Sequence, residues 1–478
     1  MVEPVDAAGL PTKLEPGDYL MFRGEGNPRT RSAGMGVNLL DTTPDWDAFR
    51  AHLAETSRRV PRLRQKVVVP ALPTAAPRWV DDPDFDLDFH VRRVRVPGPA
   101  TLREVFDLAE VLLQSPIDTA RPLWTVTLVE GLAEGRAAML LHMSHSLVDG
   151  VGGVELFAQL YGLERVPLAK RPVPRDMSPD DQLRRGTKQL RGAVLEGLWG
   201  AWSMVSRVVL QLPSALTRAI GYARSGARTL SRAAQPSPLL RQRSVASRTE
   251  ALEIRLSDLH KAAKAGGGSI NDAYLAGLCG ALGRYHRALG APIETLSMVV
   301  PVSLRTEDDP AAGNRITVVG LSAPVGEADP VDRMRKIRAQ MKQRREEPAR
   351  DILAFVRPVL SVLPAALLEA VTRPVAPWDV IASNVPSYPG DAHVAGAKVL
   401  RQYGFGALPG VAMVVNLLST GEWCTVTVRY NRAAVQDPEL FSDCLLKAYD
   451  EVLALGGEPV PRVMPASSVW ISDVRAAG

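Results

Sequence analysis

Apolar residues recur at helical spacing at two places in the first 120 positions, each behind a residue that caps helices. One helix is expected after Asp45, and a second after Thr101, which forms a capping box with Glu104. Their apolar positions are Trp46, Phe49 and Leu53 in the first helix, and Val105, Phe106, Leu108, Leu112 and Leu113 in the second. The pattern predicts two amphipathic helices that each bury one face.

Strand-like segments lie between and after these helices. Four are expected, at residues 67–69, 91–96, 124–129 and 137–143, and the last two have the apolar or β-branched content of buried strands. A further helix is expected over residues 151–163. Helices and strands that alternate in this way indicate a mixed α/β domain.

A second α/β pattern begins at residue 250. Its expected strands lie at 252–256, 296–302 and 424–430, and its helices start at Ser269 and cover 331–346 and 438–453. Residues 164–249 differ, because proline-rich, charged stretches at 166–179 and 235–249 flank a helical pattern over 190–234 that is broken near Pro213. We therefore expect two α/β domains, residues 1–163 and 250–478, joined by a basic, partly helical bridge, residues 164–249.

Composition agrees with this division. A chain of 478 residues with 46% apolar content is too long for one compact core, and its 23% charged fraction is that of a folded protein. The net charge of +5 is uneven, because residues 165–249 hold 16 lysines and arginines against 4 acidic residues, which leaves the rest of the chain at −7. Because only 5% of the chain is aromatic, the basic segment is expected to bind anionic lipid or cofactor phosphates rather than nucleic acid.

Several other classes of protein are disfavoured. Cys279, Cys424 and Cys444 are far apart and are interpreted as ordinary buried thiols, so neither a zinc site nor a disulfide framework is expected. No Gly-x-Ser-x-Gly elbow, P-loop or dinucleotide fingerprint occurs. The N-terminus lacks the pattern of a signal peptide, and no run of about 18 apolar residues could span a membrane, so a cytoplasmic location is expected.

The strongest candidate for chemistry is His145, in the segment His142-Met-Ser-His-Ser-Leu-Val-Asp-Gly150. It follows a predicted strand and precedes a predicted helix, a position at which α/β folds commonly place functional groups. A neutral imidazole can take the proton of a hydroxyl group near physiological pH, whereas Asp149 could pair with an arginine and Gly150 could permit a tight turn. Spacing alone leaves the alternative that His145 is a structural residue.

Several ordered motifs together resemble the bacterial wax ester synthase/diacylglycerol acyltransferase family, a relative of chloramphenicol acetyltransferases and peptide condensation domains. They are Leu14-Glu-Pro-Gly-Asp-Tyr19, Pro122-Leu-Trp124, the His145 segment, Asn271-Asp272, Pro301-Val-Ser-Leu-Arg305, Gly313-Asn314 and Ser383-Asn-Val-Pro386. The resemblance implies two chloramphenicol acetyltransferase-like α/β domains with the active site in a channel between them. It also implies transfer of an acyl group from acyl-CoA to diacylglycerol or a long-chain alcohol.

The family pattern assigns roles to single residues. The family usually has two adjacent histidines, of which the second is the base. His145 corresponds to this second histidine, whereas Ser144 replaces the first. The replacement could alter the site that binds the acceptor. His142 lies on an apolar strand and is interpreted as a core residue. Asn271 is the candidate that stabilises the oxyanion, although Asn271 and Asp272 could simply cap a helix behind Ser269.

The remaining matched residues keep two interpretations each. Arg305 could contact substrate or Asp149, or form a surface ion pair. Ser383 and Asn384 could line the acyl channel, or form a turn before Pro386. Pro122, Leu123 and Trp124 are expected to serve packing rather than catalysis.

The predicted partners follow from the predicted reaction. Acyl-CoA would be a co-substrate rather than a bound cofactor, no metal is expected, and the acceptor would be met at a membrane or lipid-droplet surface. An apolar stripe in the basic bridge could bind such a surface or pack onto the domains; it consists of Leu195, Leu198, Trp199, Trp202, Val205 and Val209, near Arg191 and Arg207. The alternatives are an enzyme that takes its acyl group from a carrier protein, and a non-catalytic lipid-binding protein of the same fold.

Overall fold

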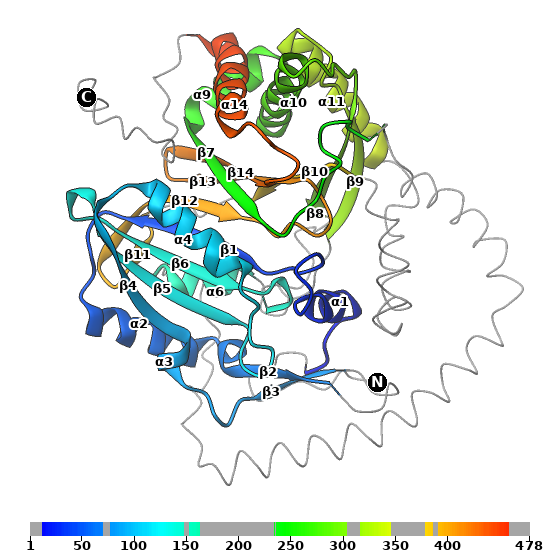
Figure 1. Cartoon of the computed structure of the whole chain (residues 1–478). Coiled ribbons are helices and arrows are strands. Elements are labelled where there is room, and N and C mark those ends of the chain that lie inside the picture. Colours follow the sequence, from blue (N-terminus) through cyan, green and yellow to red (C-terminus); the bar gives the residue numbers. More distant parts are fainter. Residues whose placement is uncertain are drawn as a thin grey trace, which may run out of the picture.

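The computed structural model describes residues 12–69, 77–147, 153–162, 234, 236–303, 316–345, 378–385 and 391–457. They form two six-stranded mixed sheets, each with its own helices and its own apolar core, and a separate two-stranded hairpin. Figure 1 shows the two sheets one above the other, with the helices of the second on the side away from the first. The mixed α/β class predicted from the sequence is confirmed.

The first sheet has the strand order β11-β12-β1-β6-β5-β4, in which β4 and β5 are parallel and the other neighbours antiparallel. Its strands are β11 (His393–Val394), β12 (Ala397–Phe405), β1 (Gly34–Leu40), β6 (Ala137–Met143), β5 (Trp124–Leu132) and β4 (Val91–Ala100). The predicted strands at 91–96, 124–129 and 137–143 are confirmed, whereas β1 and β12 were not recognised. The predicted strand at 67–69 corresponds to β2 (Gln65–Val68), which pairs with β3 (Arg78–Asp81).

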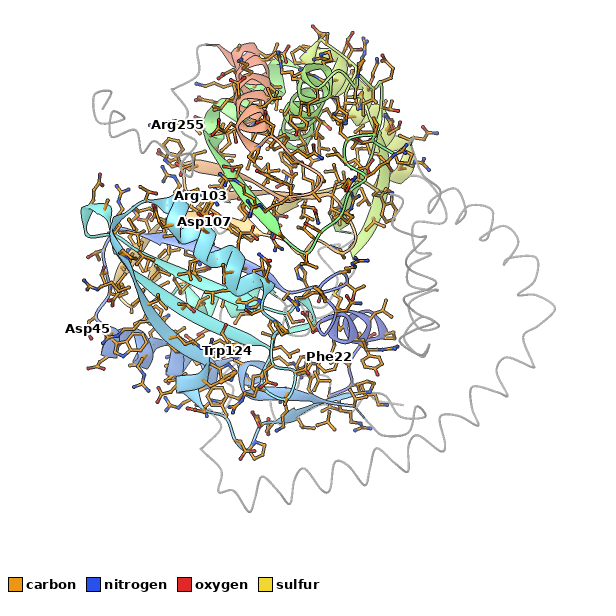
Figure 2. All side chains as sticks on the ribbon, in the orientation of Figure 1. Phe22, Asp45, Arg103, Asp107, Trp124 and Arg255 are labelled. Carbon is orange, nitrogen blue, oxygen red and sulfur yellow. The ribbon has the colours of Figure 1, made fainter. Side chains whose placement is uncertain are left out.

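The helices around the first sheet begin where their capping residues predict. Asp45 accepts a hydrogen bond from the Ala48 amide at the start of α2 (Trp46–Arg59), and Thr101 and Glu104 form the expected capping box of α4 (Leu102–Gln114). Figure 2 labels Asp45 at the start of α2. Three more helices belong to this half: α1 (Pro16–Gly24), α3 (Leu87–His90) and α6 (Gly153–Leu160).

The second sheet has the order β7-β14-β13-β10-β8-β9. Its strands are β7 (Ser247–Arg255), β14 (Trp423–Asn431), β13 (Met413–Thr420), β10 (Val380–Val385), β8 (Leu296–Ser303) and β9 (Ile316–Ala323). Its helices are α9 (Leu256–Ala265), α10 (Ile270–Ala288), α11 (Pro330–Arg345) and α14 (Pro438–Leu453), which pack on one face in Figure 1. The predicted helices and strands of this half are found, with β7 starting earlier and Leu256 beginning a helix rather than ending a strand.

Strand β12 connects the two halves of the molecule. It comes from the C-terminal part of the chain but pairs with β1, and the face of the second sheet meets its outer edge. There Thr425 donates a hydrogen bond to the Gln402 carbonyl (2.6 Å) and Asn416 donates to the Gly404 carbonyl (2.9 Å), so edge carbonyls are satisfied by side chains of the other sheet. A Cβ atom at Gly404 would lie 2.8 Å from Leu418 Cδ1, and glycine therefore permits this close approach.

Most of the predicted bridge lies outside the described residues, including the helical pattern over 190–234 and the stripe from Leu195 to Val209. The three cysteines are buried free thiols, as predicted. Within the described ranges no helix is long and apolar enough to cross a membrane.

Candidate active site around His145

His145 starts a helical turn directly after strand β6, which ends at Met143. Its side chain is exposed, whereas the neighbouring Ser144 and Ser146 are completely buried. The Ser144 amide donates to the Leu123 carbonyl (3.1 Å), so the turn is fixed to the segment that enters β5. The fold thus presents one imidazole at the end of a buried strand, as the sequence predicted.

The orientation of the His145 ring is set by a backbone carbonyl. Nδ1 lies 2.5 Å from the carbonyl oxygen of Ser32, just before strand β1. A carbonyl oxygen can only accept a hydrogen bond, so Nδ1 carries the proton and Nε2 of the neutral ring is left as the acceptor. This is the tautomer that a general base needs if it takes a proton through Nε2.

Gly34 makes room for the ring. A Cβ atom at this position would lie 3.3 Å from His145 Cε1 and 3.3 Å from the Phe405 carbonyl oxygen. The next glycine of β1, Gly36, has no such neighbour, since its Cβ would meet nothing closer than 3.8 Å. The missing side chain at Gly34 therefore lets β1, β12 and the imidazole approach one another.

Ser144 lies behind His145 rather than on an open surface. Its hydroxyl donates to Glu25 Oε1 (2.7 Å) and shares a hydrogen bond with the Ser146 hydroxyl (2.8 Å). Because Ser144 is completely buried, an effect on acceptor choice would have to act through these neighbours. Sequence reasoning did not identify Glu25, because its partner Ser144 lies 119 positions away in the chain.

The second half of the chain reaches this region through Arg429 on β14. Arg429 donates to the Gly406 carbonyl (2.9 Å) at the end of β12 and forms an ion pair with Glu110 of α4 (3.2 Å). Both side chains are buried, and the hydroxyls of Ser247 and Thr249 also donate to Glu110. In Figure 2, Arg103 and Asp107 mark the same helix at the boundary between the sheets, where Arg103 donates to the Thr249 carbonyl.

Comparisons with known proteins agree with this arrangement. Residues 3–274 match the model of the wax ester synthase/diacylglycerol acyltransferase catalytic domain, and residues 312–453 match the C-terminal domain of the same family. A Mycobacterium tuberculosis H37Rv protein named as a candidate diacylglycerol O-acyltransferase is 65% identical over 100% of this chain and 98% of its own length. The chain belongs to the wax ester synthase/diacylglycerol acyltransferase family.

Solved structures show the same fold. The wax ester synthase/diacylglycerol acyltransferase of Marinobacter aquaeolei VT8 superposes with a TM-score of 0.63 at 21% identity, covering 94% of this chain and 100% of that chain. The first condensation domain of the calcium-dependent antibiotic synthetase gives 0.59 at 15% identity, covering 97% and 99%. The fold predicted from the resemblance, two chloramphenicol acetyltransferase-like domains, is confirmed, and the protein is an acyltransferase of this family.

The other predicted site residues fall into two groups. Asp149, Gly150 and Arg305 lie outside the described residues, so their roles stay predictions. Ser383 and Asn384 lie in strand β10 rather than in a turn, because this segment pairs in parallel with β13. Ser383 is in register with Asn416, so it points to the side of the second sheet on which β12 lies, whereas Asn384 is exposed.

Asn271 stands in the first turn of α10 and is partly buried. The capping interpretation of its neighbours is confirmed: Ser269 and Asp272 exchange the two hydrogen bonds of a capping box (3.3 and 2.8 Å). The described contacts do not join Asn271 to His145. Its role toward an oxyanion stays a prediction.

Two packing predictions are confirmed. Leu123 and Trp124 are buried, and the Trp124 indole donates to the Leu63 carbonyl (2.8 Å) and stacks on His90. His142 is buried, with Nε2 lacking a partner among the described residues. Burial, together with the positive charges of Arg31 and Arg429, lowers the pKa of His142 to about 4. His142 is therefore neutral at physiological pH.

Within the described ranges, no three histidine, cysteine or acidic side chains gather closely enough to hold a metal ion. Among the described residues, the exposed group at this site is the His145 imidazole, and its neighbours supply hydroxyl, carboxylate and backbone groups. Such a set suits proton transfer from a hydroxyl.

Proposed function

We propose that the protein transfers a long-chain acyl group from acyl-CoA to diacylglycerol, which forms triacylglycerol, or to a long-chain alcohol, which forms a wax ester. The observation that supports this most directly is the state of His145. Its side chain is exposed, and its Nδ1 is committed to the Ser32 carbonyl, so Nε2 is the proton acceptor. The names of the matching family and of the 65% identical relative supply the substrate classes.

The reaction needs no covalent acyl-enzyme. Nε2 of His145 takes the proton from the acceptor hydroxyl while the oxygen of that hydroxyl attacks the thioester carbonyl carbon. The carbon–sulfur bond then breaks, and the imidazolium returns the proton to the CoA thiolate. The Nδ1 hydrogen bond to the Ser32 carbonyl keeps the ring in the same orientation during both proton transfers.

Two predicted roles belong to this proposal. Asn271 would donate to the tetrahedral oxyanion, a contribution that is typically worth about 3 kcal/mol. Asp149 would support the turn after His145, through an ion pair such as one with Arg305, rather than exchange protons. Ser383, on the face of the second sheet that meets β12, would line the acyl channel.

The membrane part of the proposal rests on the sequence. The +12 charge of residues 165–249 would attract the protein to anionic lipid at the inner face of the membrane or at a lipid droplet, where its acceptor is concentrated. Flotation with anionic and neutral vesicles tests this directly. Equal recovery with both, or no loss of binding at high salt, would contradict the electrostatic part.

Product analysis tests the reaction. Purified protein is offered labelled palmitoyl-CoA together with diacylglycerol and hexadecanol, without any carrier protein, and the labelled esters are separated. We expect a labelled ester and saturation with acyl-CoA. Products that appear only when an acyl carrier protein is added would instead favour the carrier-dependent alternative.

The matched variant is His145→Ala. It should bind acyl-CoA and keep the wild-type circular dichroism spectrum, but lose about 10²–10⁴ in rate, because a general base contributes that much. Equal turnover by both proteins would remove His145 from its role. Acyl-CoA binding with no ester from either protein would favour a non-catalytic lipid-binding protein.

A further inference from the structure

A buried carboxylate lies beneath the segment that carries His145. Glu25 directly follows helix α1 and is 0% exposed. Its Oε1 accepts hydrogen bonds from two hydroxyls, that of Ser32 (2.5 Å) and that of Ser144 (2.7 Å). One carboxylate oxygen therefore joins two segments that are more than 100 positions apart in sequence.

Both segments hold the imidazole. The carbonyl of Ser32 accepts the Nδ1 proton of His145, and Ser144 is the residue before His145. A shift of either segment would move the ring relative to its hydrogen-bond partner. The Ser144 hydroxyl also shares a hydrogen bond with that of Ser146, so both neighbours of His145 in the sequence are connected to Glu25, Ser144 directly and Ser146 through Ser144.

Arg31 holds the backbone of Glu25 in place. Its Nε donates to the Glu25 backbone carbonyl (3.1 Å), and its Nη1 donates to the Gln114 carbonyl of α4 (2.5 Å). Burial lowers the pKa of Arg31, and the charge of Glu25 opposes this change. Arg31 therefore connects the backbone of Glu25 to helix α4.

We propose that Glu25 is a positioning residue for His145, acting through the hydroxyls of Ser32 and Ser144 to keep Nδ1 protonated and Nε2 free to receive the acceptor proton. The inference rests on the proposed function of His145. It also gives Ser144 a role, because the hydroxyl that stands where the family usually has a histidine supplies one of the two donors to Glu25.

The first test is a comparison of two substitutions at one position. Glu25→Ala leaves both hydroxyls without their acceptor, and kcat should fall about 100-fold, the loss expected from an ångström-scale misplacement of a catalytic group, with KM for acyl-CoA within twofold of wild type. Glu25→Gln keeps the shape and one acceptor oxygen, so it should recover most of kcat. A kcat for Glu25→Ala within twofold of wild type would overturn the proposal.

A double-mutant cycle tests the route of the effect. Ser144→Ala alone should lower kcat about threefold to tenfold, but it should have no further effect in a Glu25→Ala background, because the hydroxyl then has no carboxylate to hold. Should Glu25→Ala not fold, Ser32→Ala and Ser144→Ala provide the same test, since their combined loss must exceed each single loss. A wild-type kcat in the Ser32→Ala/Ser144→Ala protein would contradict the positioning role of Glu25.

The matched control is Glu253, another buried carboxylate, which accepts hydrogen bonds from Tyr403 and Arg401 and has no contact with the His145 segment among the described residues. Glu253→Ala should lower the melting temperature but keep the wild-type kcat. An equal loss of kcat in Glu253→Ala would reduce the Glu25 effect to general destabilisation.

Nitrogen-15 NMR of histidine-labelled protein reads the ring itself, without turnover. The His145 signals are assigned by their loss in His145→Ala. Wild type should show a protonated Nδ1 and an unprotonated Nε2, and Glu25→Ala should show a mixture of tautomers. The same tautomer in both proteins would overturn the positioning role even if the enzyme is active, whereas a shift without any ester formation would leave positioning intact and contradict the proposed function.

Discussion

Glu110 and Glu25 are both buried carboxylates from the first half of the chain, but their partners differ. Glu110 faces the guanidinium of Arg429 at 3.2 Å and also receives two hydroxyl donors from β7. Glu25 has its two hydroxyl donors on Oε1 alone, and Oε2 has no hydrogen-bond partner among the described residues. The first carboxylate is fully paired across the two sheets, and the second is paired on one side only.

The difference follows from the place of each carboxylate: Glu110 lies at the junction of the two sheets, and Glu25 lies behind His145. A buried charge at a domain junction costs several kcal/mol unless it is paired and hydrogen-bonded, and Glu110 meets both conditions. A carboxylate behind a reacting group can be less completely satisfied, because such sites place geometry before local stability. We therefore expect substitutions at the junction to change mainly stability, and substitutions around His145 to change mainly rate.

The largest expected effect is at the junction. Arg429→Met leaves Glu110 buried with hydroxyl donors only, and it should destabilise the protein by about 3–5 kcal/mol in urea unfolding followed by circular dichroism. Adding Glu110→Gln should recover a large part of this loss, because the uncompensated charge is then removed. A single-variant loss below about 1 kcal/mol would show that the pair does not hold the two sheets together.

An intermediate effect on stability is expected from the titration of His142. Arg31, next to Glu25, and Arg429, next to Glu110, both lower the pKa of this histidine. Its pKa is lowered from 6.5 to about 4 in the folded protein, so the unfolded chain binds more protons between these values. Stability must therefore decrease as pH falls from about 6.5 to 4, by on the order of 3 kcal/mol for this group.

His142→Leu tests this by removing the titrating ring. The variant should lose less stability than wild type over the same pH interval, measured by urea midpoints at several pH values. His260→Gln, a change at an exposed histidine of α9, serves as the control. Parallel pH curves for wild type and His142→Leu would contradict the assignment.

The smallest effect is expected at Gly34, in the region around His145. Gly34→Ala places a methyl group 3.3 Å from His145 Cε1, so the ring must move by a few tenths of an ångström, and kcat should fall about tenfold with little change in melting temperature. Gly36→Ala, on the same strand but with no neighbour closer than 3.8 Å, should keep the wild-type rate. Equal rates for both variants would mean that the ring is not held against β1.

Local patterns predicted much of the fold correctly. The caps at Asp45, Thr101 and Ser269 mark helix starts, and the strands at 91–96, 124–129, 137–143 and 296–302 carry enough apolar or β-branched residues to be recognised. The strands β1 and β12 were missed because glycines and polar residues interrupt them at Gly34, Gly36, Asn38, Gln402 and Gly404. These interruptions are the places where the imidazole, buried amides and the second sheet come close.

The site was predicted only in part. His145 could be found because it lies in a motif at the end of an apolar strand, and a histidine there is chemically informative by itself. Glu25 and Arg429 could not be assigned roles in this way, because their meaning depends on partners 119 and 319 positions away. A charged residue on an otherwise buried face, such as Glu110 in α4, shows only that a partner must exist.

The sequence by itself determined the helix starts, the two α/β patterns, the position of His145 at a strand end and the family to which the chain belongs. These features depend on residues that are neighbours along the chain, where periodicity and capping act. Only the tertiary structure decided that β12 joins the first sheet, that the Ser32 carbonyl fixes the His145 tautomer, and that Glu25 and Ser144 meet behind it. Such contacts depend on burial and charge pairing between distant segments, which leave no periodic trace in either segment alone.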